Sequence, residues 1–472
     1  MSKSLHISRR AFLGATAAGI GTLAVGKGVS DFYSTIDAKA HIVIIGGGAA
    51  GCSLASRLMR KLKYPNITLI DPADKQFYQP GFTFIAAGIF QPNEVWKRQD
   101  ECLPQGKGFQ WVKEKVVKLD PDQRKVHTDA GQIVEYDYLV LTPGLQLNWK
   151  GIGVKGKGIE VPEGEEFAPL TEELLPIVAK QGNAHCIYHF EGAQSIWPAI
   201  QELTEKGGRG LFTDTYTKHK CGGAPKKICL LTEHLARQKG TRQKPQLDYF
   251  CSEKALYDVP YYTPRLLQIY EERGINLVVR HKLVGIDIDN KIATFQPYVI
   301  DEEGNKTDLP ERVQEHYDLL SFVPPQSAPD FVKASGLSWQ EGKLAKDGWV
   351  EVDRETLIHA RYPNIVSFGD VAGIPTSKTS SAVRKQLPIV QDNLLAIMQG
   401  KEPTARYNGY ACCPIVTEYG RVLLCEFDYD KNPDITFPFS MLDMSHEQWA
   451  GWLLKRYFLK PMFFEAMLPG YM

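Results

Sequence analysis

Continuous apolar runs recur along the chain, and each one predicts a strand buried on both faces of a parallel sheet. Residues 42–45 are β-branched throughout, and residues 67–70 form a second apolar run. The residues between them, 53–58, fit a helix. Residues 138–144 contain another buried strand that ends in a Pro-Gly turn, and residues 365–370 return to the same unit. This alternation of strands and helices predicts an α/β fold.

Alternation of apolar and polar positions predicts antiparallel strands elsewhere in the chain. Residues 112–119, 125–128 and 133–136 fit a three-stranded meander. Residues 277–284 and 291–298 fit a hairpin within a second, middle unit.

A glycine-rich turn follows the first predicted strand directly. Gly46 permits the tight turn, Gly48 lets the backbone approach a pyrophosphate, and Gly51 allows close helix–strand packing, with Ala50 inside the turn. The N-terminus of the next helix offers free N–H groups to the phosphates. Asp71 ends the second strand, where an acid holds a ribose hydroxyl. Together these features predict a dinucleotide site; the alternative is a tight βα turn without a ligand.

A second intact fingerprint is missing from the sequence. An enzyme that takes hydride from NADH needs one in its middle third, but residues 184–194 contain a single glycine. A further predicted strand, at residues 227–231, leads into residues 232–234, which contain none. Side chains then occupy the space that a second pyrophosphate requires. The bound dinucleotide is therefore expected to be the redox cofactor itself, FAD, with electrons from a donor smaller than NADH.

Composition excludes several classes of protein. The chain has 472 residues, enough for two or three domains, and 55 basic residues balance 55 acidic ones, so no nucleic-acid partner is implied. The nine cysteines show neither CxxC nor metal-ligand spacing, and His189, His219 and His234 show none either. The sequence therefore predicts no metal site and no disulfide-stapled scaffold.

The N-terminus fits a targeting segment. Arg9 and Arg10 form a twin-arginine pattern, and the Gly/Ala-rich residues 14–26 are too short for a comfortable membrane span. Residues 38–40 match an A-x-A cleavage pattern. We expect export by the twin-arginine route to the periplasmic face of the inner membrane. The alternative is an ordinary basic N-terminal helix.

The C-terminal tail, residues 449–472, is rich in Trp, Phe, Leu and Met. Lys455, Arg456 and Lys460 are interleaved with these side chains. An apolar body with cationic heads predicts an amphipathic helical segment that lies in a membrane interface. A C-terminal helix packed on its own domain is the alternative.

The predicted fold is thus two Rossmann-like dinucleotide-binding-type domains, the second without an intact fingerprint, plus the C-terminal amphipathic segment. The predicted boundaries are residues 1–40 for the signal and linker, 41–150 for the first part of the FAD-binding domain, 151–330 for the second Rossmann-like domain, 331–400 for the second part of the FAD-binding domain, and 401–472 for the C-terminal membrane-interface region.

Residues 220–228, KCGGAPKKI, resemble the KCAGAPxKI segment of sulfide:quinone oxidoreductases. Residues 78–83, 369–379 and 409–414 are also similar to that family, best to the branch that includes the mitochondrial enzyme. The resemblance covers nearly all of the chain after residue 40. It implies a disused second nucleotide site, bound FAD and peripheral membrane association. It also implies oxidation of sulfide to polysulfide, or to a persulfide on an acceptor, with electrons passed to a quinone.

The resemblance also implies roles for single residues. Cys221 is expected to hold sulfane sulfur next to the flavin, and the lysines around it would favour the thiolate; the alternative is an inert buried cysteine. Gly369 and Asp370 are expected at the FAD ribityl chain, and the backbone at Gly144 closes over the flavin. Lys378 is expected near the flavin or quinone, where a cation stabilises an anionic reduced species.

Val371 departs from the family pattern, because related enzymes read Gly-Asp-Cys there and that cysteine pairs with the equivalent of Cys221. Three explanations stay open. Another cysteine replaces it, Cys221 works alone, or the protein oxidises another substrate. The candidate replacements are Cys412, Cys413, Cys186 and Cys102. Cys413 falls on a Cys-Pro pair whose role looks structural, so Cys412 is the additional thiol, although a weak candidate.

Three rival functions also stay open. A flavocytochrome-type sulfide dehydrogenase would pass electrons to a cytochrome, but the amphipathic tail disfavours it. An NADH:quinone reductase is disfavoured by the missing fingerprint. A flavin-binding or sulfur-carrier protein without catalysis is motivated by Val371. The sequence is also compatible with a homo-oligomer.

Overall fold

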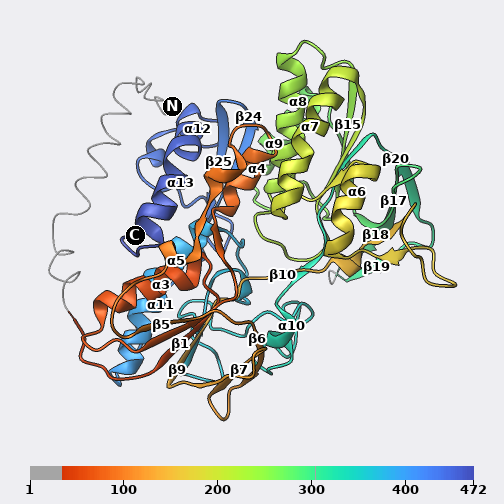
Figure 1. The fold of residues 1–472 in the computed structure, drawn as a ribbon. Helices are drawn as coiled ribbons and strands as arrows, with labels where there is room; N and C mark the ends of the chain where they lie inside the picture. The colour runs from red at the N-terminus through yellow and green to blue at the C-terminus, as the bar shows by residue number, and fades with distance from the viewer. Residues whose placement is uncertain (1–34, 303–304) are drawn as a thin grey trace.

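The computed structural model describes residues 35–302 and 305–472. The twin-arginine pattern and the run at 14–26 lie outside these residues. Within them, the first unit is built on a parallel sheet in the order β23-β9-β1-β2-β5 (Figure 1). Its strands are β1 (Ile42–Ile45), β2 (Ile67–Ile70), β5 (Phe109–Val112), β9 (Tyr138–Leu141) and β23 (Ile365–Ser367). The helices α3 (Ala49–Lys61) and α11 (Ser380–Met398) pack together beside this sheet.

The second unit repeats this plan with a parallel sheet in the order β13-β21-β14-β15-β16. Its strands are β13 (Ala184–His185), β14 (Gly208–Thr213), β15 (Pro245–Cys251), β16 (Asn276–Val279) and β21 (Leu319–Ser321). In each sheet the central strand leads through a helix to its neighbour, β1-α3-β2 in one and β14-α8-β15 in the other. The α/β fold with two Rossmann-like units is therefore confirmed.

The strand expected at residues 227–231 is wrong, because these residues lie inside helix α8 (Ala224–Gln238). The helix is buried over most of its length between the second sheet and the hairpin of β24 (Ala411–Glu418) and β25 (Arg421–Phe427). A helix covered on several sides shows a continuous apolar run, which periodicity cannot distinguish from a buried strand.

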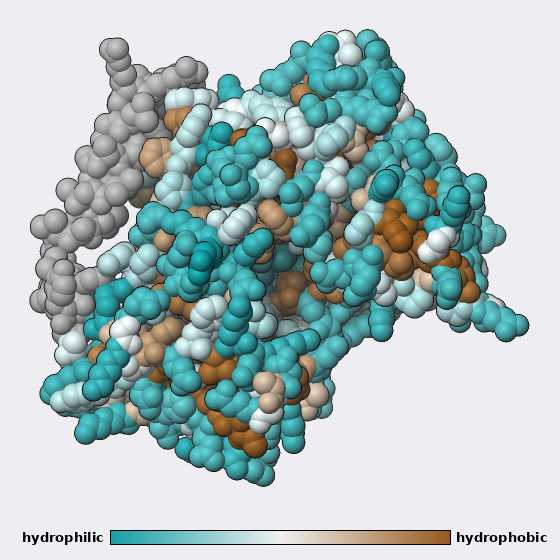
Figure 2. Space-filling model, viewed as in Figure 1, coloured by the Kyte–Doolittle hydropathy of each residue, from teal (hydrophilic) through white to brown (hydrophobic). Residues whose placement is uncertain are grey.

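Antiparallel ribbons flank the two sheets. The meander is confirmed as β6 (Val116–Asp120), β7 (Lys125–Thr128) and β8 (Ile133–Glu135). The predicted hairpin is formed by β17 (His281–Asp287) and β18 (Ile292–Ile300), whereas residues 277–279 belong to β16 of the parallel sheet. Figure 2 shows hydrophobic side chains gathered over the meander, where Val117 and Ile133 are exposed.

The other helices and short strands connect these units. The helices are α4 (Phe82–Ile85), α5 (Gln99–Cys102), α6 (Leu175–Gly182), α7 (Phe190–Lys206), α9 (Thr263–Glu272) and α10 (Asp330–Lys333). The strands are β3 (Lys75–Phe77), β4 (Trp96–Arg98), β10 (Gln146–Leu147), β11 (Gly153–Lys155), β12 (Ala168–Pro169), β19 (Lys306–Asp308), β20 (Val313–His316) and β22 (Gln326–Ser327).

The tail folds back onto the first unit, beside α3 and α5 in Figure 1. It consists of α12 (Trp449–Leu453), a π-helical turn (Leu454–Phe458), α13 (Leu459–Met462) and a second π-helical turn (Phe463–Met467). Arg57 of α3 donates a 2.6 Å hydrogen bond to the carbonyl of Met472, and Arg60 donates to the carbonyls of Pro469 and Gly470. Among the described helices, none has the length and hydropathy needed to cross a bilayer.

Candidate active site

The glycine-rich turn after β1 is shaped by close backbone packing. Gly46 has a positive φ of 95°, and a Cβ there would lie 2.3 Å from the carbonyl oxygen of Thr142. A Cβ on Gly51 would lie 1.9 Å from the carbonyl oxygen of Gly46. A Cβ on Gly48, by contrast, would meet no atom of the described chain within 4 Å. The turn is thus tight on its inner side and open at Gly48, where a phosphate group fits.

Asp71, at the end of β2, holds the same turn. Its Oδ2 accepts a 2.6 Å hydrogen bond from the backbone N–H of Gly47, and its Oδ1 accepts one of 2.7 Å from Ala73. Burial raises the pKa of its carboxyl group. The Gln99 side chain, which sequence reasoning missed, donates to the carbonyl of Gly47 at 2.8 Å and leaves its own buried oxygen without a partner among the described residues. Such an unsatisfied polar atom beside the turn fits a bound dinucleotide.

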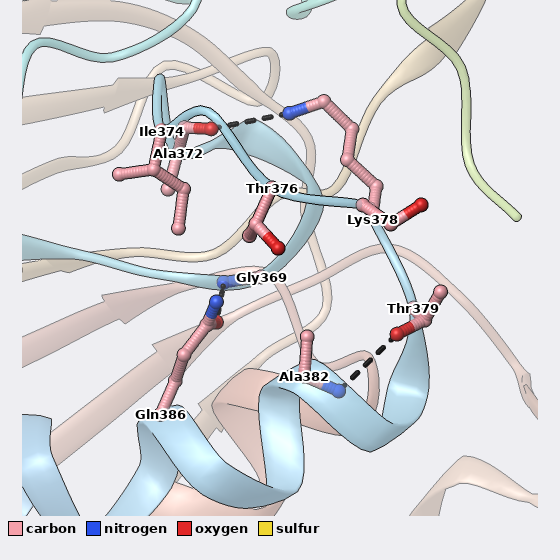
Figure 3. Close-up of a pocket in the computed structure, with 9 residues that line it drawn as sticks. Gly369, Ala372, Ile374, Thr376, Lys378, Thr379, Ala382 and Gln386 are labelled. Atoms are coloured by element: carbon pink, nitrogen blue, oxygen red, sulfur yellow. Dashed lines mark hydrogen bonds between the residues drawn. The ribbon is translucent and has the colours of Figure 1, made fainter. Parts of the chain in front are cut away.

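Gly369 closes the opposite side of this turn. Its φ is 76°, its N–H donates to the side chain of Gln386 at 2.9 Å, and a Cβ there would lie 3.3 Å from Cβ of Ala50. A pocket extends from Gly369 to the N-terminus of α11, where Thr379 caps the helix by accepting from Ala382 (Figure 3). The pocket is lined by Gly369, Ala372, Ile374, Thr376, Ser377, Lys378, Thr379, Ala382 and Gln386.

Gly144 and Asp370 lie on the two loops that follow β9 and β23, which are paired strands. Gly144 has a φ of 75° and open space where a side chain would be. Asp370 is half-buried; desolvation raises the pKa of its carboxyl group, and the nearby charges of Lys220 and Lys378 act in the opposite direction. Open backbone at one loop and an acid at the other fit a flavin and its ribityl chain.

The Lys378 ammonium makes its contacts inside the protein. It donates to the carbonyl oxygen of Ala372 at 3.1 Å (Figure 3). It also donates to the carbonyl oxygen of Asp370 and lies 3.7 Å from the ring centroid of Trp349. Burial lowers its pKa to about 7. Its backbone carbonyl accepts from the N–H of Cys221 at 2.9 Å. Lys378 therefore connects the cofactor pocket to the loop that carries Cys221.

That loop, residues 214–223, joins β14 to α8. In the first unit the equivalent β1–α3 connection is the glycine-rich turn, so the loop stands where a second dinucleotide would bind. Cys221 has a φ of 46°, a left-handed conformation that is costly for a residue with a side chain and is typical of functional sites. The segment 184–194, which we considered for a second fingerprint, lies instead at β13 on the edge of the sheet.

The thiol partner of Cys221 is Cys413, and the two sulfur atoms lie 3.6 Å apart. This corrects the expectation that Cys413 is structural and that Cys412 is the available thiol. Adjacent residues of β24 face opposite sides, so that Cys413 faces the core of the second unit and Cys412 the core of the first. Val371 is completely buried in that first core. Cys186 directly follows β13 and Cys102 ends α5; among the described residues, the hydrogen bonds of the Cys221 sulfur go to Cys413 and Lys227 and to neither of these cysteines.

Lys227, in the first turn of α8, donates to the Cys221 sulfur at 3.4 Å. The hydrogen bond from Cys413 and the charges of Lys227 and Lys455 hold the pKa of Cys221 well below its ordinary value. The same interaction, together with burial, raises the pKa of Cys413. The N-terminus of α8 directly after this loop also favours an anion. Cys221 is thus the thiolate and Cys413 the thiol of the reduced pair.

Lys455 reaches this site from the tail, which sequence reasoning missed. Its ammonium lies 3.4 Å from the carbonyl oxygen of Pro80 and 4.7 Å from the ring centroid of Phe84. Burial lowers its pKa to about 7. The neighbouring tail residues Tyr457 and Phe458 are 58% and 49% exposed. The tail therefore contributes one cation to the interior and presents aromatic rings to the outside.

Comparison with known proteins agrees with this geometry. The sequence model of the pyridine nucleotide-disulphide oxidoreductase family matches residues 40–174. The mitochondrial sulfide:quinone oxidoreductase of Mus musculus is 33% identical over 92% of this chain and 88% of its own length. The Dictyostelium discoideum protein of the same description is 34% identical over 91% and 86%. The X-ray structure of the Aquifex aeolicus sulfide:quinone oxidoreductase has the same fold, with a TM-score of 0.68 at 20% identity over 92% of both chains.

Proposed function

The chain belongs to the sulfide:quinone oxidoreductase family, and from this premise we propose that it oxidises sulfide to sulfane sulfur with FAD as cofactor and a membrane quinone as electron acceptor. The observation that carries the proposal is the Cys221–Cys413 pair, with the Lys227 ammonium 3.4 Å from the Cys221 sulfur. A thiol pair with one stabilised thiolate is suited to exchange with sulfur nucleophiles.

FAD would be held by residues of the first unit. Gly46, Gly48 and Gly51 give its pyrophosphate access to the backbone, and Asp71 stands at the ribose position. Asp370 and the N-terminus of α11 lie where the ribityl chain and the flavin ring would be. When bound, the flavin supplies a two-electron acceptor that restores the disulfide and passes the electrons on to quinone.

The sulfur chemistry follows from the unequal pKa values of the two cysteines. In the oxidised pair, HS⁻ attacks the Cys413 sulfur, the S–S bond breaks, and the electron pair leaves on Cys221, because the thiol of lower pKa is the better leaving group. Lys227 stabilises that thiolate. Cys413 then carries a persulfide, and a nucleophilic acceptor removes its outer sulfur, which leaves the reduced pair ready for reoxidation.

Membrane association and location complete the proposal. The exposed rings of Tyr457 and Phe458, with Arg456 between the tail and the body, suit the headgroup region of a membrane, where quinone is available. The twin-arginine pattern supports export of the folded, flavin-loaded protein to the periplasmic face of the inner membrane.

The test is an anaerobic titration of the purified flavoprotein with sulfide, followed by a short-chain quinone. We expect sulfide to bleach the flavin absorption and quinone to restore it. Bleaching that only a cytochrome partner reverses would favour a sulfide dehydrogenase of the flavocytochrome type. A flavin that sulfide leaves oxidised would contradict sulfide as the substrate.

A further inference from the structure

A buried ion pair contacts the turn that carries Cys221. Asp214 directly follows β14, and Lys226 lies in the first turn of α8. The Lys226 ammonium lies 3.2 Å from Oδ2 of Asp214, and the two side chains are only 5% and 2% exposed. Burial disfavours each charge, but the attraction between the two is the largest opposing cause, and the pKa of Asp214 is lowered while that of Lys226 is raised. Both groups therefore stay ionised.

The Lys226 ammonium joins this ion pair to the backbone of the turn. It donates to the carbonyl oxygen of Gly222 at 2.9 Å, and Gly222 directly follows Cys221. The next residue, Gly223, packs so closely on the Cys413 sulfur that a Cβ there would lie 2.5 Å from it. Because Cys221 has a left-handed φ of 46°, the surrounding structure must hold the turn in this shape. The Lys226 hydrogen bond thus acts on the backbone between the Cys221 side chain and the surface on which the Cys413 sulfur packs.

The ion pair is itself fixed to strands β14 and β15 of the second sheet. Oδ1 of Asp214 accepts a 2.6 Å hydrogen bond from the N–H of Ser252, the residue after β15. The hydroxyl of Tyr249, in β15, donates to Oδ2 of Asp214 at 3.2 Å and accepts from Lys226 at 3.2 Å. These contacts connect the turn to the sheet. Lys226 occupies the unspecified position x of the KCAGAPxKI segment, so the connection is not part of that motif.

We propose that Lys226 and Asp214 are positioning residues for the disulfide between Cys221 and Cys413, an inference that rests on the sulfur chemistry of the proposed function. When this bond forms, the two thiols lose two protons, and two electrons pass to an acceptor, either the flavin or an external disulfide. By fixing the carbonyl of Gly222, Lys226 keeps the Cys221 thiol beside the Cys413 sulfur before the bond forms. Bond formation then removes less freedom than it would from two unrestrained thiols, and this stabilises the disulfide relative to the dithiol.

The test is the equilibrium between this disulfide and dithiothreitol, which gives up two electrons and two protons as it closes to its own cyclic disulfide. The flavoprotein is equilibrated anaerobically at neutral pH, alkylated, and read at the Cys221 peptide. The double variant Asp214→Asn/Lys226→Met leaves no buried charge unpaired and keeps an acceptor for Ser252, but it removes the donor to the Gly222 carbonyl. We expect its disulfide to be about 10-fold easier to reduce, which corresponds to a potential about 30 mV less negative.

The matched control is Arg209→Met/Asp248→Asn. It removes another buried ion pair of the same sheet, with Arg209 Nε 2.6 Å from Asp248 Oδ2, at the opposite end of β14. Its thermal stability should fall, whereas its disulfide equilibrium should keep the wild-type value. If Asp214→Asn/Lys226→Met does not fold, Tyr249→Phe replaces it, because this change removes one hydrogen bond from each member of the ion pair. We expect Tyr249→Phe to shift the equilibrium in the same direction by about 3-fold.

The outcomes separate this inference from the proposed function. A wild-type equilibrium in the folded test variant, or an equal shift in the Arg209→Met/Asp248→Asn control, would overturn the inference and leave the proposed function intact. A wild-type protein that forms no Cys221–Cys413 disulfide in any dithiothreitol mixture would overturn both. The expected shift, together with a flavin that sulfide leaves oxidised, would contradict the proposed function alone.

Discussion

The Lys227 ammonium lies 3.4 Å from the Cys221 sulfur, and both groups belong to the connection between β14 and α8. Because Lys227 belongs to the first turn of the helix that directly follows the loop, its ammonium group stays close to the Cys221 sulfur. We expect Lys227→Met to raise the pH at which Cys221 becomes reactive by about one pH unit, since an opposite charge at this distance lowers a pKa by that amount or more. Iodoacetamide labelling of the reduced protein across pH, read at the Cys221 peptide, measures this.

Lys227→Arg is the matched control, because it keeps the charge and should leave the labelling profile close to that of wild type. An unchanged profile in Lys227→Met would show that Cys413 and Lys455 alone keep the thiolate.

Cys413, not Cys412, should be required for sulfide oxidation. Cys413→Ser is expected to abolish reversible bleaching by sulfide, as is Cys221→Ser, because no disulfide can form. Cys412→Ser should retain the activity, since that side chain faces the other core. Alkylation under denaturing conditions provides the direct measure: the oxidised protein should show two fewer reactive thiols than the nine of the reduced chain. Nine thiols in the oxidised form would argue against the pair.

Gly48 and Gly51 should respond differently to substitution, although they belong to the same turn. Gly48→Val places its side chain in open space and in extended backbone, so the apoprotein should unfold within a few degrees of the wild-type apoprotein. The same side chain would fill the phosphate position and clash with the cofactor. The flavin-to-protein ratio should therefore fall by about 10-fold or more, because a clash at a binding contact lowers the affinity by about that factor. Gly51→Val collides with the Gly46 carbonyl and should destabilise the fold itself. Full flavin content in Gly48→Val would contradict the proposed position of the cofactor.

NADH should leave the flavin oxidised. The loop at residues 214–223 and the buried Asp214–Lys226 pair occupy the place where a nicotinamide nucleotide would bind in the second unit. Anaerobic mixing with NADH in a stopped-flow instrument tests this, with sulfide as the positive control. Rapid bleaching by NADH would mean that a nucleotide enters this unit by another route.

The exposed aromatic rings of the tail should govern binding to vesicles. Replacing Tyr457 and Phe458 together by serine is expected to reduce co-sedimentation with anionic vesicles, because the two rings are among the apolar groups presented to solvent. Tyr64→Ser removes a ring of similar exposure, 48%, from another part of the surface and serves as the control. Equal loss of binding in both variants would indicate a nonspecific effect, and bleaching of the flavin by sulfide should persist in both.

Local signals explain how far the sequence could predict this structure. The strand, glycines, helix and acid of the first nucleotide turn are contiguous, so each could be read from residues 42–71 alone. Cys221 was also recognisable, because its loop carries a short motif with nearby lysines. The helical state of residues 227–231 was not, since an apolar run this short fits a buried segment of a helix as well as a strand.

The pairing of Cys221 with Cys413 spans 192 residues and depends on how β24 packs against α8. No local pattern encodes that packing, and the motif at Val371 pointed elsewhere. The alternation of side chains along β24 decides which of two adjacent cysteines meets the loop. The roles of Gln99 and Lys455 were equally hidden, because each depends on contacts between segments far apart in the sequence.

The hydrogen bonds from Arg57 and Arg60 to the last residues of the tail have a practical consequence for work on this protein. A purification tag fused after Met472 would extend the chain from a point that is anchored on α3, and it would compete with the seating of the segment that delivers Lys455. An affinity handle is therefore better placed upstream of β1 than directly after Met472.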